Sequence, residues 1–373
     1  MMVRDAALMI CDLNYALVTH GYGTQDGHPW NVLFDFTEPR FVDFGSIVPI
    51  QDFTGRWVDE WCNLFRRCWL TPLSFMSIGY PTLARCVNKA LDVDEPIDSL
   101  LASRWLSWFP WWYRGCRRLA RKDPTAYFRA MRNRIQTISP PMRRTEWSKY
   151  FRYTGYPVHD DVEHYNRKAR TIFSLLQRLK PRTVLDIGAN KGWYSILAAR
   201  LGAEVVSFDT DEECVNSLYL YCRSAKHKVL PLVIDFTIPT PRHGRKVEFP
   251  SAQERLACEV SLALALVHHL VFSAHMGFER IAQLLAGFTT GHAIVEFVPA
   301  RDKFVAEWMR PGFEWYTMDN FIKAMGRTFT LEAVFDSDPP RQVLLFRKRS
   351  MADIRPARGL SNTAPSDSRA TAS

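Results

Sequence analysis

The chain has 373 residues, 47% of them hydrophobic and 23% charged, so it can bury a sizeable core and is not a disordered chain. This length suits one large domain or two ordinary ones. The formal net charge of +9 is concentrated in residues 104–152, where thirteen basic residues face two acidic ones, and such a segment predicts an acidic partner.

The eight cysteines are scattered without a C-x-x-C pair, so the sequence predicts reduced thiols and neither a zinc site nor a disulfide framework. Asp5 and Asp12 interrupt the first apolar stretch, which therefore lacks the hydrophobic core of a secretory signal. The most apolar run, residues 260–273, is shorter than the ~20 residues of a membrane-spanning helix. These features predict a soluble cytoplasmic protein with no metal site.

Four zones are expected along the chain. Residues 1–100 mix helical and strand-like patches, residues 101–170 form a basic, aromatic and helical connector, and residues 171–350 alternate strands and helices. The tail, residues 351–373, is rich in Ser, Thr, Ala, Pro and Arg without apolar periodicity, so it is expected to be disordered.

The first zone contains a pattern of acidic and amide residues. Asp26 and Asn31 have D-x-x-x-x-N spacing, and residues 43–45 read Asp-Phe-Gly. This resembles the catalytic and metal loops of protein-kinase-like phosphotransferases, in which these residues orient the nucleophile and hold magnesium. Thr24 stands where that family usually has His, and neither a Gly-rich loop nor a strand lysine precedes the pattern. We therefore expect a degenerate kinase-like module that has lost phosphotransfer.

A basic aromatic belt follows, comprising six aromatic and five basic residues: Trp105, Trp108, Phe109, Trp111, Trp112, Tyr113, Arg114, Arg117, Arg118, Arg121 and Lys122. A helix with this composition can lie on an anionic membrane surface or stack its rings on sugars or bases. The plainer alternative is a connecting helix with its aromatic residues in a core and its arginines in water. No nucleic-acid motif is found, so no nucleic-acid partner is expected.

The third zone predicts repeated strand–helix units. The expected strands are residues 183–187, 204–208, 229–234, 260–266, 293–298, 328–335 and 342–347, the last two as an antiparallel pair. This pattern predicts an α/β fold with a doubly wound, mostly parallel, seven-stranded sheet, preceded by a smaller and mostly helical region.

A glycine turn follows the first of these strands. Gly188 and Gly192 let the backbone approach a ligand closely, and the helix that follows offers free N–H groups. Asn190 stands where a dinucleotide-binding G-x-G-x-x-G motif needs its second glycine. Asp186 is unsuited to a diphosphate but suits a ligand with a cationic amino-acid end.

Acidic residues end the next two strands. Asp209 is placed to bind ribose hydroxyls, and Asp211 could share that role. Asp235 is placed to accept a hydrogen bond from an adenine amino group. The ordered set resembles the class I methyltransferases, which implies that S-adenosylmethionine is the cofactor. The alternatives are a Rossmann dehydrogenase and a fold that has lost its site.

Residues 264–270 follow the fourth strand and contain two adjacent histidines. In the family that this chain resembles, this strand end faces the transferred methyl group, so His268 or His269 could be a general base. Alternatively, one histidine is part of the wall, and methyl transfer relies on proximity and orientation alone. Glu296 ends the fifth strand, and its role, structural or substrate-facing, is left open.

The whole order of motifs, including Trp57, Trp61 and Phe65 before the methyltransferase-like part, resembles a bacterial family of host-specific nodulation proteins, the rhizobial NoeA type. The resemblance implies a role in nodulation and a small-molecule or saccharide methyl acceptor. The second hypothesis is a non-catalytic adaptor that uses residues 104–152 on an anionic membrane. The protein would then be cytoplasmic and peripheral at the inner membrane.

Overall fold

The computed structural model describes residues 1–51, 56–89, 109–141, 145, 147, 162–244 and 249–350. The chain forms two compact units, one of Met1–His164 with Phe173–Ile238 and one of Tyr165–Ile172 with Pro239–Ser373. The expected disordered tail and residues 101–108, 142–144, 146 and 148–161 of the connector lie outside the described residues, and the four zone boundaries remain predictions. Among the residues that are described, no helix is long and apolar enough to cross a bilayer.

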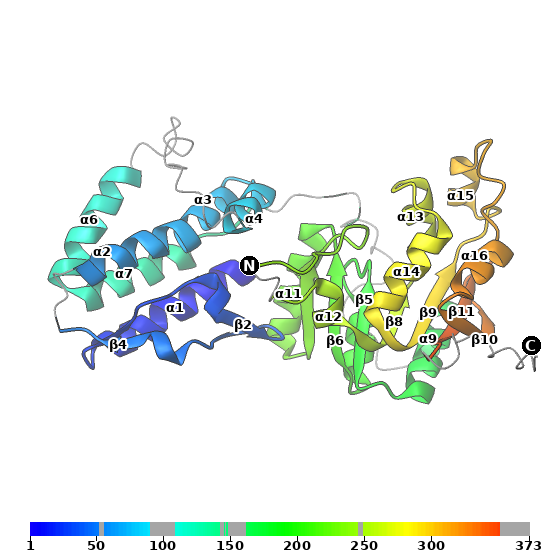
Figure 1. Cartoon of the computed structure of the whole chain (residues 1–373), viewed down its shortest axis with the longest axis horizontal. Coiled ribbons are helices and arrows are strands. Elements are labelled where there is room, and N and C mark those ends of the chain that lie inside the picture. Colours follow the sequence, from blue (N-terminus) through cyan, green and yellow to red (C-terminus); the bar gives the residue numbers. More distant parts are fainter. Residues whose placement is uncertain are drawn as a thin grey trace, which may run out of the picture. The chain divides into compact units, whose positions relative to one another are not determined.

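The N-terminal region, the part of the first unit up to residue 147, is mostly helical (Figure 1). Its helices are α1 (Met2–Val18), α2 (Arg56–Phe65), a π-helical turn η3 (Arg66–Leu70), α3 (Thr71–Ser77), α4 (Pro81–Lys89), α6 (Phe109–Lys122) and α7 (Pro124–Gln136). Two short antiparallel pairs accompany them, β1 (Tyr22–Thr24) with β4 (Ile47–Pro49) and β2 (Val32–Asp35) with β3 (Glu38–Phe41). The 3-10 turns η1 (Pro29–Asn31) and η2 (Phe44–Ser46) lie between these strands.

Aromatic rings form the core of this region. Trp61 stacks on Phe65 with ring centroids 4.7 Å apart, and it meets the edges of Tyr127 and Phe128 from α7. The indole N–H of Trp69 donates to the carbonyl of Gly27 at 2.7 Å, so no indole donor is lost on burial there. These rings tie α2, η3 and α7 to the loop that carries the kinase-like pattern.

The second half of the chain carries a seven-stranded sheet in the order β10-β11-β9-β8-β5-β6-β7. Its strands are β5 (Thr183–Ile187), β6 (Glu204–Asp209), β7 (Val229–Val233), β8 (Cys258–Ala263), β9 (Thr289–Phe297), β10 (Phe329–Asp336) and β11 (Gln342–Lys348). The pairs β5–β6, β6–β7 and β8–β9 are parallel, whereas β11 runs antiparallel to both β9 and β10. The predicted mostly parallel sheet with a terminal antiparallel strand is confirmed.

Helices precede and connect these strands, and the alternation from β5 onward is the predicted one. They are η5 (Val162–His164), α9 (Arg167–Leu179), α10 (Trp193–Arg200), α11 (Glu212–Ala225), α12 (Ala252–Leu256), α13 (Val267–Phe272), α14 (Phe278–Phe288), α15 (Lys303–Trp308) and α16 (Met318–Met325). Within the first unit, α10 and α11 pack on β5, β6 and β7. In the second unit, α14 packs on β8, β9 and α16.

Two strand boundaries were predicted wrongly by more than two residues. The fifth strand was expected from residue 293, but β9 begins at Thr289. The fourth strand was expected over residues 260–266, but β8 ends at Ala263 and α13 begins at Val267. Ala265 has a φ of +50°, which ends the extended backbone. Periodicity alone could not show this, because the apolar run suits a buried strand and a buried helix equally.

Candidate functional site

The turn between β5 and α10 has a left-handed backbone at three residues. The φ angles are +69° at Gly188, +50° at Asn190 and +73° at Gly192. Glycine adopts this conformation freely, and asparagine adopts it more easily than most residues. A Cβ at residue 192 would also lie 2.3 Å from Cδ2 of Leu218. The turn therefore needs glycine at 192 for two separate reasons and tolerates Asn190 in place of a glycine.

Asp209, at the end of β6, holds this turn. Its Oδ2 accepts the backbone N–H of Asn190 at 2.8 Å, and its Oδ1 accepts the backbone N–H of Asp211 at 2.9 Å. Burial raises the pKa of the Asp209 carboxyl, although these backbone donors oppose the shift. A carboxylate has about four lone-pair directions, so two backbone bonds leave it able to accept from ligand hydroxyls.

The other two predicted acids lie at the ends of neighbouring strands. Asp186 in β5 is 3% exposed, and its Oδ2 accepts the hydroxyl proton of Ser195 at 2.6 Å. Asp235 follows β7 and is exposed, and its Oδ1 accepts from the backbone N–H and the hydroxyl of Thr237. The carboxyl ends of parallel strands lie at one edge of a sheet, so the three acids share that edge.

Asp211 and Asn190 have further contacts that the sequence did not predict. Asp211 caps α11, where its Oδ1 accepts the backbone N–H groups of Glu213 and Cys214. The Nδ2 of Asn190 donates to the carbonyl of Trp147 at 3.2 Å, which links the glycine turn to a residue 43 positions earlier.

The two histidines lie on α13 in the second unit. His268 is 4% exposed, and its Nδ1 has no hydrogen-bond partner among the described residues. Burial lowers the pKa of His268 to about 3 and that of His269 to about 4. The ring of Trp308 lies 5.9 Å from His268 and 5.2 Å from His269, measured between centroids. Both imidazoles are therefore neutral near pH 7.

Glu296 has a structural role, which resolves the question left open by its position. Its Oε2 lies 2.5 Å from the ammonium nitrogen of Lys168, and its Oε1 accepts the hydroxyl proton of Ser337 at 2.6 Å. Burial opposes ionisation of this carboxyl, but Lys168 and Ser337 outweigh that effect and lower its pKa. Both carboxylate oxygens are thus used within the protein.

The kinase-like residues gather around one asparagine. Nδ2 of Asn31 donates to Oδ2 of Asp43 at 3.2 Å and to the backbone carbonyl of Asp26 at 3.1 Å. The two side chains that hold magnesium in kinases are therefore in contact here. No group of three or more His, Cys, Asp or Glu residues able to hold a metal is found among the described residues. The kinase-like assignment stays a prediction.

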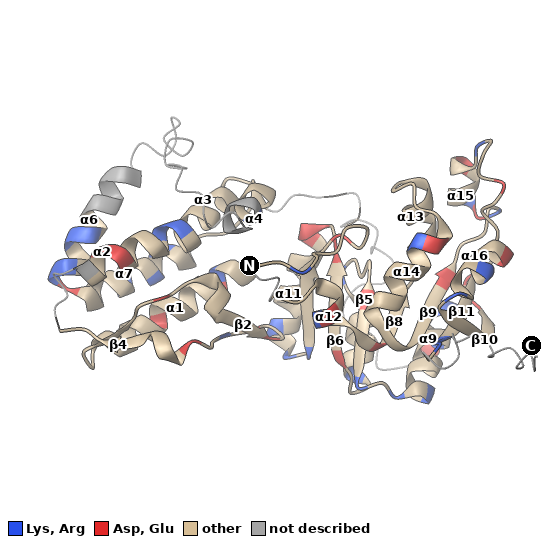
Figure 2. Cartoon of the chain, in the orientation of Figure 1, with Lys and Arg blue, Asp and Glu red and all other residues tan. Residues whose placement is uncertain are grey.

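The basic aromatic belt is partly neutralised inside the protein. Arg117 and Arg121 on α6 both pair with Asp59 on α2, whereas Arg118 is exposed. Figure 2 shows basic positions on α6 in blue and an acidic position on α2 in red. Asp59 has a lowered pKa because the Arg117 guanidinium donates to it, with Arg121 adding to the effect. Trp105 and Trp108, and the side chains of residues 109–114, lie outside the described part of the chain.

The order of the strands and the single reversed strand, β11, define a class I methyltransferase fold. The chain is a homologue of nodulation protein NoeA of Rhizobium meliloti (strain 1021), with 27% identity over 359 residues that cover 87% of this chain and 73% of NoeA. The resemblance to the NoeA type is thereby confirmed. No family model matches the sequence.

Two further similarities are more limited. The O-antigen chain terminator bifunctional methyltransferase/kinase WbdD of Escherichia coli is 28% identical over 108 residues, which are 29% of this chain and 14% of WbdD. Magnesium protoporphyrin IX methyltransferase of Synechocystis PCC 6803, solved with bound S-adenosylmethionine, is 15% identical over 48% of this chain and 79% of that one, with a TM-score of 0.35. At that score, the strand order, rather than the structural similarity, identifies the fold.

Proposed function

We propose that this chain is an S-adenosylmethionine-dependent methyltransferase. The observation that carries the proposal is the pair of hydrogen bonds from the Asn190 and Asp211 backbones to Asp209. They place a glycine turn and a half-buried carboxylate at the carboxyl ends of β5 and β6, where ligands bind in open α/β sheets. A cofactor bound there would supply a methyl group activated by its sulfonium.

The residues present fit the chemistry of this cofactor. Asp186 would face its ammonium group, Asp209 with Asp211 its ribose hydroxyls, and Asp235 its adenine amino group. The turn would allow close backbone approach of a ligand at Gly188, which has no Cβ, whereas Gly192 makes room for the Leu218 side chain. Diphosphate binding is disfavoured, because Asp186 would place a carboxylate beside it.

The proposed role of His268 is limited by its burial. With a pKa of about 3, its imidazole is neutral at physiological pH and free to accept a proton, but it is a weak base. Orientation of the acceptor and the sulfonium would then carry most of the catalysis. The acceptor class, a small molecule or a saccharide used in nodulation or at the cell surface, rests on the NoeA relative alone.

Calorimetric titration of the full chain with S-adenosylmethionine and S-adenosylhomocysteine, against ATP with magnesium, tests the proposal. Micromolar binding of the first two and none of ATP is expected. Asp209→Ala should weaken binding at least ~10-fold, since hydrogen bonds to a charged group contribute about 1.5–3 kcal/mol. Glu204→Ala, at the exposed start of the same strand, is the matched control and should bind normally.

Absence of binding by the unaltered chain would overturn the proposal. It would leave a methyltransferase fold without its chemistry, and the non-catalytic adaptor would become the better hypothesis. Equal affinities of the Asp209→Ala and unaltered chains would instead show that the cofactor does not bind at the end of β6.

A further inference from the structure

A cavity of about 960 Å³ lies within the first unit, next to the carboxyl ends of β6 and β7. One wall comes from the sheet and the start of α11, and the other comes from the N-terminal region. The first wall includes Thr210, Leu232 and Val233, and the second includes Met76, Leu83 and Trp147. The volume is within the range of small-molecule sites.

Residues that line the cavity are close neighbours in the sequence of the proposed cofactor-binding acids. Thr210 directly follows Asp209, and Leu232 and Val233 directly precede the turn that carries Asp235. Trp147 belongs to the opposite wall, and its carbonyl accepts from the side chain of Asn190 in the glycine turn. The nucleoside end of the proposed cofactor site is thus continuous with a wall made by the N-terminal region.

We propose that the N-terminal region builds the outer wall of the adenosine pocket, so that cofactor binding and docking of this region are coupled. The inference rests on the proposed function and adds to it. Met76, Leu83 and Trp147 give that wall an apolar and aromatic surface, which suits the flat face of a purine.

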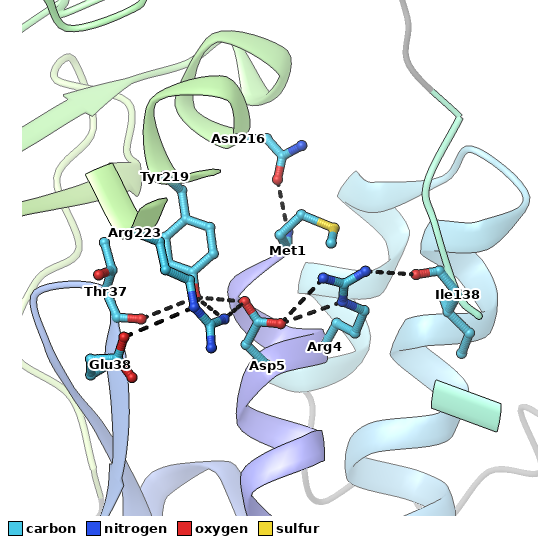
Figure 3. A network of polar contacts seen from close by, with 9 residues as sticks. All are labelled: Met1, Arg4, Asp5, Thr37, Glu38, Ile138, Asn216, Tyr219 and Arg223. Atoms are coloured by element: carbon cyan, nitrogen blue, oxygen red, sulfur yellow. Dashed lines mark hydrogen bonds and ion pairs between the residues drawn. The ribbon is translucent and has the colours of Figure 1, made fainter. Parts of the chain in front are cut away.

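The coupling runs through α11. The start of this helix lines the cavity, and its second half holds the N-terminal region at a buried carboxylate (Figure 3). Asp5 is 5% exposed and pairs with the guanidinium of Arg223. The hydroxyl of Tyr219 lies 2.8 Å from Oδ2 of Asp5 and 3.1 Å from the carbonyl of Thr37, the residue before β3.

The helix α11 thus contacts both the cavity, through its start, and the N-terminal region, through Arg223. Arg223 also lies 4.0 Å from Glu38 in β3, and Arg4 lies 3.4 Å from Asp5. The coupling free energy between two sites acts equally in both directions. If a ligand at the start of α11 binds more tightly when the N-terminal region is docked, its binding must therefore stabilise the contacts at Asp5.

Titration with S-adenosylhomocysteine and with 5′-methylthioadenosine tests the wall. Trp147→Ala and the cavity-filling Leu83→Trp should each weaken both ligands about tenfold, because the wall faces only the nucleoside. Both side chains are exposed, 39% for Trp147 and 41% for Leu83, so neither change should unfold the chain. Tyr22→Ala, an exposed aromatic residue of the same region outside the cavity, is the control and should leave both affinities unchanged.

Hydrogen exchange tests the coupling. Saturating S-adenosylhomocysteine should slow exchange in α1 and β2–β3, and Arg223→Ala, which does not line the cavity, should weaken the ligand several-fold and remove that protection. Normal binding by the unaltered chain with unchanged affinities in Trp147→Ala and Leu83→Trp would overturn this inference alone. Failure of the unaltered chain to bind would overturn it together with the proposed function.

Discussion

The ammonium nitrogen of Lys168 lies 2.5 Å from Oε2 of Glu296, and the two side chains are 12% and 0% exposed. An unpaired charge buried at this site would strongly lower the free energy of unfolding, whereas the intact ion pair contributes little net stability. Lys168→Met should therefore destabilise the chain by about 3–5 kcal/mol, and the double variant with Glu296→Leu should recover part of that loss. Urea denaturation measures the free energy of unfolding.

The matched control is the exposed pair of Lys228 and Glu204, which are 3.2 Å apart and 63% and 53% exposed. Lys228→Met should cost less than about 1 kcal/mol, because solvent screens this pair. If Lys168→Met costs no more than Lys228→Met, the buried pair has been assigned too large a role.

Two groups in the second unit, His268 and Glu296, both have a lowered pKa, and both shifts predict loss of stability in acid. His268 has a folded-state pKa of about 3 against an ordinary value of 6.5, so below pH 6.5 the unfolded chain binds protons that the folded chain does not. Glu296 has a lowered pKa, so its contribution is complete above 4.5 and is lost as the pH falls through its folded-state value.

The two contributions separate by pH. Between pH 6.5 and 5, His268→Gln should reduce the decline in unfolding free energy without removing it, because the pKa of His269 is also lowered, to about 4. Glu296→Gln should reduce the decline only below about pH 4.5. Urea denaturation at half-unit pH steps measures both. An imidazole of His268 that titrates near pH 6.5 by NMR would contradict the first expectation.

Gly192→Ala should destabilise the chain more than Gly202→Ala. Both residues have positive φ, +73° and +95°, so both substitutions strain the backbone. Only at 192 does the added Cβ meet a side chain, Leu218, whereas nothing lies within 4 Å at 202. The difference in unfolding free energy should be about 1–3 kcal/mol, the usual cost of overpacking.

A second substitution checks the cause. In a Leu218→Ala background the clash is absent, so Gly192→Ala should there lower the unfolding free energy only by the cost of backbone strain. Additive losses in a double-mutant cycle would show that the clash with Leu218 is not the reason for glycine at this position.

The basic aromatic belt gives a prediction for vesicles with anionic lipids. If residues 104–152 bind such a surface, Arg118→Gln should reduce co-sedimentation, because this guanidinium is exposed. Arg117→Gln should have a smaller effect on binding and a larger one on stability, because Arg117 already pairs with Asp59. Equal effects on binding, or binding that is insensitive to salt, would argue against the surface.

The sheet could be predicted from sequence because its signals are local. Short β-branched runs bounded by turns and helices mark β5, β6 and β7, and β5 was predicted residue for residue. The same holds for the glycine turn, where the residue types that tolerate positive φ appear in the sequence itself.

What the sequence could not show depends on contacts between distant residues. Glu296 was ambiguous because its partner Lys168 lies 128 positions earlier. Asp5 was interpreted only as a break in an apolar stretch, because no nearby residue indicates that Tyr219 and Arg223 are its partners. The wall at Trp147 was missed for the same reason, as its link to Asn190 is made by a backbone carbonyl and carries no residue signature.

The buried carboxylate of Asp5 also limits how this chain can be rearranged in evolution. Transplanting the N-terminal region onto another methyltransferase fold would strand an anion in an apolar setting unless the recipient already offered a tyrosine and an arginine one helical turn apart, as Tyr219 and Arg223 are here. A working transfer of the N-terminal region therefore requires that α11 be transferred with it, even where each half would fold alone.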